Sequence, residues 1–256
     1  MEKIVWNWFT AIGLQQVDGL KVSEYLYDTA KRNMDGRISA ERAKKIIDNY
    51  YRCGEGLKED DFFEEADKVS SRIVKILCEP SFNFSVSYLI SIHKYLFDGL
   101  YEFAGKIRDY DITKREWVLD GDTVTYGPAY ILDKSLEYDF EHEKAFNYDN
   151  PLSYDTIKHV SSFVSETWQL HPFGEGNTRT IAVFIIKYLR HLGYKEMGKP
   201  FFKCSRYFRD ALVRANYNNF PKGVHATTEY LELFFRNLLL GEDNELENHF
   251  THIRYT

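Results

Sequence analysis

This sequence has few cysteines and no long apolar run. Its three cysteines, Cys53, Cys78 and Cys204, are widely spaced and form no CxxC pair, so we expect reduced thiols rather than a disulfide framework or a cysteine metal site. No stretch approaches the ~18 apolar residues that a membrane span needs. Residues 1–19 also lack the uninterrupted apolar core of a signal peptide. We therefore expect a cytoplasmic protein that does not bind membranes.

An excess of positive charge is also absent. The formal net charge is −6, whereas a nucleic-acid-binding protein usually presents a basic face, so we expect no nucleic-acid partner. The sequence shows no internal repeat and no low-complexity region. Its 256 residues, 44% of them hydrophobic, suffice for one large domain, with or without a small appendage.

What stands out is the stretch His-Pro-Phe-Gly-Glu-Gly-Asn-Thr-Arg at positions 171–179. Apolar residues recur at helical spacing on both sides of it, from Tyr154 to Leu170 and from Ile181 to Leu192. Pro172 disfavours helical geometry at the residue before it. The pattern therefore predicts a helix–loop–helix junction.

The loop of this junction is suited to bind phosphate. Gly174 and Gly176 let the backbone turn its amide groups inward, which forms an anion-binding nest. Asn177 and Thr178 stand at the start of the second helix, where free N–H groups and the positive end of the helix dipole favour an anion. Arg179 adds a planar, permanently charged donor for phosphate oxygens.

Two further residues of the loop supply chemistry. Glu175 would repel a phosphate unless a divalent cation lay between them, and its hard carboxylate oxygens suit magnesium. His171, at the end of the first helix, is placed to take a proton from an incoming hydroxyl. Together with Arg179 and the loop amides, these residues predict in-line attack on a phosphorus centre and hence nucleotidyl transfer.

The same stretch resembles the signature of the Fic family, His-x-Phe-x-Asp/Glu-Gly-Asn-Gly-Arg-x-x-Arg. The residues that match are His171, Phe173, Glu175, Gly176, Asn177 and Arg179. The resemblance implies that His171 is the general base, that Glu175 is the magnesium ligand, and that Asn177 and Arg179 bind phosphate. Phe173 would be the apolar anchor of the loop. Most members of the family transfer AMP from ATP to a protein hydroxyl.

Two positions depart from this signature. Thr178 replaces the family's second glycine, which narrows the nest, although its amide can still donate and its hydroxyl can bind phosphate or cap the helix. Ala182 replaces the final arginine, which in the family contacts the terminal phosphate of ATP. This replacement removes a charge-assisted contact worth about 1.5–3 kcal/mol, so a donor other than ATP stays open.

Residues 1–55 read as a small helical unit. Asp18-Gly19-Leu20, followed by Asp35-Gly36-Arg37-Ile38-Ser39, resembles the Fic antitoxin module, whose inhibitory helix carries Ser/Thr-x-x-x-Glu-Gly. Here Leu14 replaces the hydroxyl, and Asp18 replaces the glutamate that pairs with the final arginine of the signature. Because both ends of that pair are altered, we expect weak or absent self-inhibition through it. The alternative is a helical cap with no regulatory role.

Strand signals gather in one short region. Trp117-Val118-Leu119 and Thr123-Val124-Thr125-Tyr126 flank Asp120-Gly121-Asp122, which predicts a β-hairpin. An isolated hairpin is marginally stable, so it must pack on the helices or serve a partner. The resemblance favours a flap from Trp117 to Tyr126 whose exposed edge aligns an extended segment of a target protein near His171. The alternative is a simple connector.

Other positions carry weaker signals. His93, in a helix predicted over residues 86–100, is interpreted as a packed helix histidine rather than a metal ligand, and Arg108 as a residue open to a structural role. In Fic proteins the segment around Asn216 borders the adenine. Asn216 is therefore a candidate for contact with the base, although an asparagine that ends a helix is equally consistent. Arg209 stands where the family usually has a tyrosine, so the identity of the base stays open.

We therefore predict a mainly α-helical fold. It would comprise an antitoxin-like helical segment over residues 1–55, a Fic core with a β-hairpin flap over 60–240, and a C-terminal tail over 241–256 that frays from Leu246 onward. The predicted activity is transfer of AMP from Mg-ATP to a Ser, Thr or Tyr hydroxyl of a target protein or of the chain itself. The alternatives are a Fic-like transferase with another nucleotide or a phosphocholine donor, and a binding module without turnover. Aromatic-rich helices leave room for a homodimer that buries the N-terminal segment.

Overall fold

The computed structural model describes residues 2–53, 60–194 and 199–253, and these residues are mainly helical. The α-helices are α1 Glu2–Gln15, α2 Glu24–Met34, α3 Ala40–Arg52, α4 Glu64–Cys78, α5 Val86–Phe97, α6 Leu132–Ala145, α7 Tyr154–Leu170, α8 Asn177–His191, α9 Lys199–Lys203, α10 Ser205–Ala215, α11 Glu229–Phe235 and α12 Asn248–Thr251. Short 3₁₀ turns are η1 Gln16–Asp18, η2 Asp60–Phe63, η3 Trp117–Leu119, η4 Ala129–Ile131 and η5 Phe220–Lys222, and a π-helical turn, η6 Arg236–Leu240, continues α11. The prediction of a mainly α-helical fold is confirmed.

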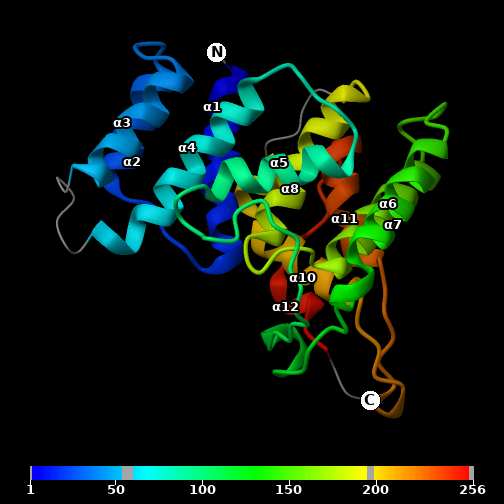
Figure 1. The fold of residues 1–256 in the computed structure, drawn as a ribbon. Coiled ribbons are helices and arrows are strands. Elements are labelled where there is room, and N and C mark those ends of the chain that lie inside the picture. The colour runs from blue at the N-terminus through cyan, green and yellow to red at the C-terminus, as the bar shows by residue number, and fades with distance from the viewer. Residues whose placement is uncertain (1, 54–59, 195–198, 254–256) are drawn as a thin grey trace.

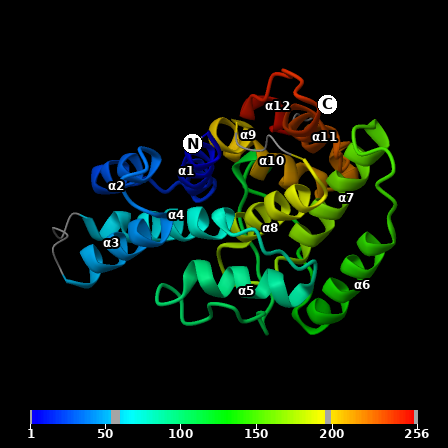
Figure 2. The same cartoon turned by 90° about the horizontal axis from the view of Figure 1, so that it is seen from above.

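Helix α8 is the central element of the core. Every residue from 177 to 189 is buried, and α8 contacts α1, α4, α5 and α7. A helix that is buried all round belongs to the interior of a domain. Figures 1 and 2 show α8 in the middle of the molecule, with α2 and α3 at one end and α6 and α7 at the other.

Serine caps fix where four of the helices begin. The side chains of Ser23, Ser39, Ser85 and Ser153 accept a hydrogen bond from the backbone N–H three residues on, at the starts of α2, α3, α5 and α7. Each cap satisfies an N–H group that the helix itself cannot, and its loss costs about 1 kcal/mol.

The N-terminal helix α1 is packed into the core. It contacts α4, α9 and α10, and Trp8 and Leu14 are fully buried. A Cβ on Gly13 would lie 2.6 Å from the carbonyl oxygen of Phe201, so the backbones of α1 and α9 meet without room for a side chain. Residues 54–59, where the sequence places the boundary between the N-terminal segment and the core, lie outside the described residues, and this boundary stays a prediction.

The hairpin predicted over residues 117–126 is wrong. No named strand occurs in the described residues, and the first half of the expected hairpin is the 3₁₀ turn η3. Val118 and Leu119 are adjacent and both fully buried, whereas successive residues of a strand point to opposite faces. Asp120 and Gly121 then take positive φ angles of 53° and 85°, which turn the chain back as a compact loop.

The expectation of a frayed C-terminal tail is wrong for residues 248–253. Helix α12 packs against α10, Thr251 and Ile253 are buried, and the N–H of Ile253 donates to the carbonyl of Val118 at 2.9 Å. This end of the described chain therefore supports the 117–126 loop from behind, as the neighbouring green and red segments in Figure 1 show. Among the described helices, none combines the length and the apolar character that crossing a membrane requires.

Candidate active site

His171 ends α7 in a left-handed backbone conformation. Its φ of 48° and ψ of 58° cost a non-glycine residue roughly 1–2 kcal/mol, and Pro172 excludes the α-helical alternative. The side chain is buried, and its Nδ1 lies 3.3 Å from the carbonyl oxygen of Trp168. Nδ1 is therefore assigned the proton, and Nε2 keeps its lone pair. Nε2 has no hydrogen-bond partner among the described residues.

The surroundings of His171 keep its imidazole neutral. Burial lowers the pKa of His171 well below its ordinary value, and the positive charge of Lys114 lowers it further. The ring also lies against Tyr126, with 4.4 Å between the ring centroids. A neutral imidazole with a free, buried Nε2 can accept a proton from a hydroxyl that reaches it.

Arg108 holds the strained turn in place. Its guanidinium donates to the carbonyl oxygens of His171 at 2.8 Å, Leu170 at 3.0 Å and Tyr110 at 2.6 Å, and also to that of Gly127. Its backbone N–H donates to the carbonyl of Pro172 at 2.8 Å. The structural role left open for Arg108 is therefore confirmed, because this side chain ties α7, the turn and the approach to the 117–126 loop together.

The loop after His171 is closed by its own side chains. Asn177 accepts from the backbone N–H of Phe173 at 2.9 Å and donates to the carbonyl of Phe173 at 2.7 Å. The hydroxyl of Thr178 accepts from the indole of Trp168 at 3.0 Å. Gly176 caps α8 with a φ of 76°, and a Cβ there would lie 2.3 Å from the ring of Phe97. The amide of Asn177 thus braces the loop, and the backbone N–H groups of the first turn of α8 are the ones left for an anion.

Arg179 is turned toward the N-terminal segment. Its guanidinium is 2.7 Å from the carboxylate of Asp18, donates to Glu65 at 2.6 Å and to Gln15 at 3.1 Å, and lies over the ring of Phe97. Burial lowers the pKa of Arg179, but the two carboxylates more than offset this, so its pKa rises. A phosphate that is to bind Arg179 must therefore compete with Asp18 and Glu65.

Glu175 faces the segment that leads into the 117–126 loop. Its side chain is 51% exposed, and its carboxylate lies 2.9 Å from the ammonium of Lys114. Because Lys114 also acts on the pKa of His171, this lysine brings Glu175 and His171 into one electrostatic environment. The loop residues Glu175 and His171 therefore lie in one environment with Lys114, a residue just before the 117–126 loop that was not predicted from the sequence.

Comparisons with known proteins agree with this geometry. Residues 83–189 match the Fic/DOC family. The chain contains a Fic/DOC domain. The protein adenylyltransferase VbhT of Bartonella schoenbuchensis is 31% identical over 113 residues, which are 43% of this chain and 22% of VbhT. The probable protein adenylyltransferase y4lH of Sinorhizobium fredii is 28% identical over 137 residues, which are 53% of this chain and 67% of y4lH.

The Fic/DOC match begins just before α5 and ends within α8. It includes the whole loop from His171 to Arg179, as well as His93, Arg108 and Lys114. Asp18 and Asn216 lie outside it. The roles expected for all of the site residues, inside the match and outside it, stay predictions. The resemblance identified from the signature is thus confirmed for the domain that carries the loop.

The loop of the Fic/DOC domain fits a magnesium ion in one particular way. No cluster of three or more His, Cys, Asp or Glu side chains among the described residues could hold a metal ion alone. Magnesium commonly binds one or two carboxylates and completes its shell with phosphates and water. The half-exposed carboxylate of Glu175 would supply the protein ligand of such a site, and the N–H groups at the start of α8 would bind the phosphates that complete the shell.

Asn216 does not face the loop in this structure. Its amide nitrogen donates to the carbonyl and hydroxyl oxygens of Ser165 and to the carbonyl of Leu212, which ties α10 to α7. Arg209 instead approaches the site, because both of its terminal nitrogens contact the buried carboxylate of Glu116, at 2.7 and 3.0 Å. Glu116 also accepts from Tyr126 at 3.2 Å, and Tyr126 contacts His171.

The contacts that His93, Glu65 and Glu116 make with the site were not predicted from the sequence. All three lie outside residues 171–179. His93 contacts Glu175, Glu65 contacts Arg179, and Glu116 contacts Tyr126, which lies against His171. A histidine on the apolar face of a predicted helix and a glutamate just before the predicted turn were the available signals. These signals do not indicate the partners, which lie 82 positions from His93, 114 from Glu65 and 10 from Glu116.

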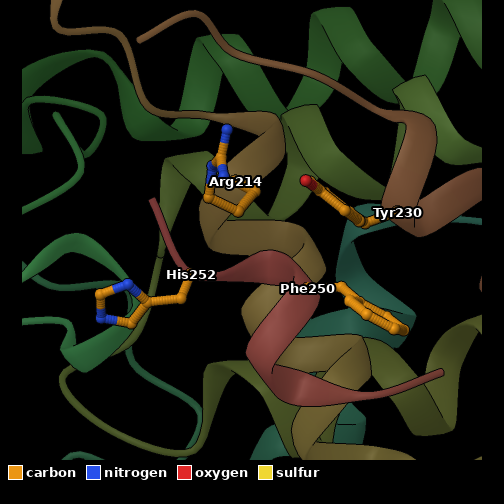
Figure 3. Close-up of a pocket in the computed structure, with 4 residues that line it drawn as sticks. All are labelled: Arg214, Tyr230, Phe250 and His252. Atoms are coloured by element: carbon orange, nitrogen blue, oxygen red, sulfur yellow. The ribbon is translucent and has the colours of Figure 1, made fainter. Parts of the chain in front are cut away.

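Two surface cavities lie elsewhere, and neither is lined by residues 171–179. One, of about 410 Å³, is formed by Arg214, Tyr230, Phe250 and His252. Figure 3 shows Phe250 on α12, His252 just after it, and the Tyr230 hydroxyl directed toward Arg214. The other, of about 680 Å³, lies between α6 and α7 and reaches Leu170. The loop of residues 171–179 therefore lies outside these two cavities.

Proposed function

We propose that this chain is a protein adenylyltransferase, which transfers AMP from Mg-ATP to a Ser, Thr or Tyr hydroxyl of a target protein or of the chain itself. The observation that carries the proposal is the unpartnered Nε2 of a buried, neutral His171. It stands at the head of a loop whose helix start suits phosphate. The similarity to VbhT, a protein adenylyltransferase, and to y4lH, a probable protein adenylyltransferase, supports the same activity.

His171 would act as the general base. The target hydroxyl donates its proton to Nε2, while the Nδ1–H group keeps donating to the carbonyl oxygen of Trp168 and holds the ring in this tautomer. The freed oxygen attacks the α-phosphorus of ATP, and the bond from that phosphorus to the pyrophosphate oxygen breaks. Burial of His171 keeps the base unprotonated, because the charged imidazolium is disfavoured there.

The first turn of α8 would hold the phosphates through its N–H groups, with the positive end of the helix dipole behind them. Magnesium held by Glu175 would neutralise phosphate charge and favour departure of pyrophosphate. Lys114, now 2.9 Å from Glu175, adds a cation at the same place. The target segment would bind along residues 117–126, which Tyr126 joins to His171.

A different donor is the second candidate, and Ala182 favours it. This residue is fully buried in α8 and supplies no charge for a terminal phosphate. The guanidinium of Arg179, already paired with Asp18 and Glu65, is engaged elsewhere as well. A donor with less phosphate charge than ATP, such as a phosphocholine conjugate, or binding without turnover would both be consistent with these contacts.

A donor panel separates these candidates. The purified chain is incubated with magnesium and with ATP, GTP, CTP or UTP, each radiolabelled at the α-phosphorus, and in parallel with a labelled phosphocholine conjugate. Label transferred from ATP to protein, and absent with His171→Ala, is the expected result. Transfer from another donor alone would replace ATP in the proposal, and silence with every donor from a folded protein would favour binding without turnover.

A further inference from the structure

His93 in α5 contacts the loop of the proposed active site directly. Its side chain is fully buried. Nδ1 accepts from the backbone N–H of Gly105 at 2.8 Å, and Nε2 lies 3.0 Å from the backbone carbonyl of Glu175. A backbone N–H can only donate and a carbonyl can only accept. The two contacts together therefore place the imidazole proton on Nε2, which donates to Glu175.

A third contact fixes the plane of this ring. His93 stacks on Phe173, with 3.8 Å between the ring centroids and 8° between the planes. Phe173 and Glu175 are the two loop residues on either side of Gly174, so His93 contacts the loop at two places.

His93 also joins the loop to Gly105, in the segment between α5 and the 117–126 loop. Gly105, whose φ is 76°, lies three residues before Arg108, and Arg108 donates to the carbonyl oxygens of His171 and Pro172. The loop is thus held from two sides, by Arg108 at His171 and by His93 at Glu175. The first of these braces the proposed base, and the second braces the residue that bears the proposed metal-binding carboxylate.

We propose that His93 is a positioning residue, which fixes the backbone of Glu175 so that its carboxylate faces the phosphate-binding turn of α8. This inference rests on the proposed function, because it gives His93 a role toward the metal ion that Glu175 would hold. Partners of metal ligands commonly change metal affinity by about 10–100-fold when they are removed. The alternative is a histidine that only fills the core, which would affect stability alone.

Two matched variants separate these roles. In His93→Gln the side-chain amide reaches the place of Nε2 and can donate to Glu175, but no acceptor remains for Gly105. In His93→Asn the shorter side chain places its oxygen where Nδ1 was and can accept from Gly105, but the donor to Glu175 is lost. Both variants lose the stacking on Phe173, so their losses of packing are similar.

The test measures manganese binding to the full chain. Mn²⁺ stands in for magnesium, because carboxylate, phosphate and water ligands suit both ions. It is titrated by electron paramagnetic resonance in the presence of a non-hydrolysable ATP analogue, with Glu175→Gln as the control that removes the ligand itself. We expect His93→Asn to bind Mn²⁺ about 10-fold or more weakly than wild type and His93→Gln to stay within about 3-fold. The two variants should show similar losses in melting temperature.

Equal Mn²⁺ affinity in both variants, or weaker binding in His93→Gln than in His93→Asn, would overturn the positioning role. Absence of Mn²⁺ binding to the wild type would also overturn the positioning role. The proposed function is tested separately, by label transfer in the donor panel. If His93→Asn does not fold, the wild type supplies the measurement through the ¹⁵N-correlated signal of the His93 Nε2–H. This signal should shift when Mg²⁺ and the analogue are added and stay still in Glu175→Gln, and an unchanged signal in wild type would contradict the proposal.

Discussion

Arg108 should be among the residues whose loss costs the most stability. Its side chain is 1% exposed and donates to four backbone carbonyls, those of His171, Tyr110, Gly127 and Leu170. A buried acceptor left without a donor costs about 1–3 kcal/mol. Because water can enter part of the space that the side chain leaves, we take about 1 kcal/mol for each carbonyl. Arg108→Ala should therefore lower the free energy of unfolding by about 4 kcal/mol.

Arg108→Lys tests whether the shape of the side chain or its charge matters. A lysine carries three donors on one nitrogen, whereas the guanidinium spreads five donors over a planar fork. One ammonium cannot reach four separated carbonyls, so we expect a loss of about 2 kcal/mol, half that of the alanine variant.

Urea unfolding followed by far-ultraviolet circular dichroism measures both losses. Arg37→Ala is the matched control, because that side chain is 72% exposed and lies 3.4 Å from Asp35, and it should cost less than about 0.5 kcal/mol. A loss below about 1 kcal/mol for Arg108→Ala, or wild-type stability for Arg108→Lys, would refute the reasoning.

Three further variants test other parts of the account. Burial raises the pKa of Asp139 to about 6, so the folded state disfavours the charged carboxylate. Asp139→Asn should therefore raise the free energy of unfolding by about 1–2 kcal/mol at pH 7.5, and this gain should disappear near pH 4, where the carboxyl is protonated in the folded state. A gain in urea unfolding that does not depend on pH would contradict the assignment. Asp18→Gly removes one of three polar partners of Arg179, so label transfer should change by less than about threefold, and a manyfold gain would show self-inhibition through Asp18. In Gly176→Ala the new Cβ stands at a φ of 76° and lies 2.3 Å from the ring of Phe97, whereas in Gly36→Ala it stands at a φ of 74° with no atom nearby. Thermal melts should show that the first variant loses at least about 2 kcal/mol more stability than the second. Equal losses would mean that the Phe97 ring moves aside.

The helices that flank the loop could be predicted because their signals are local. Helix α7 runs from Tyr154 to Leu170, the range expected from its apolar spacing. Ser153 caps its start, and Pro172 prevents its continuation. A turn at Gly176 was likewise expected, because glycine lets the backbone turn, and Gly176 has a φ of 76°.

The 117–126 loop could not be predicted from its residues. Val118, Val124 and Tyr126 are strand-forming types, but their burial against the rest of the fold decides the conformation. The support comes from the C-terminal segment, where Ile253 donates to Val118, more than a hundred positions further along the chain. Composition is a weaker determinant than such a tertiary contact.

The partners of Arg179 also follow from the fold alone. By resemblance, Asp18 corresponds to the glutamate that pairs with the arginine replaced here by Ala182, and this altered pair predicted weak or absent self-inhibition through it. In the structure Asp18 lies 2.7 Å from Arg179, and Gln15 reaches the same guanidinium across 164 positions of sequence. Long-range ion pairs of this kind leave no periodic pattern in the sequence. Arg179 could therefore be predicted as a functional residue, but its partners could not.

The most direct test of the account is label transfer by the wild type and by His171→Ala, side by side. Both proteins are incubated with magnesium and ATP labelled at the α-phosphorus, with lysate proteins as acceptors, after matching melting curves have shown that both are folded. The account predicts label on protein with the wild type and none with His171→Ala, because Nε2 of His171 is the proposed proton acceptor. Undiminished labelling by the folded alanine variant would contradict the assignment of His171 as the base.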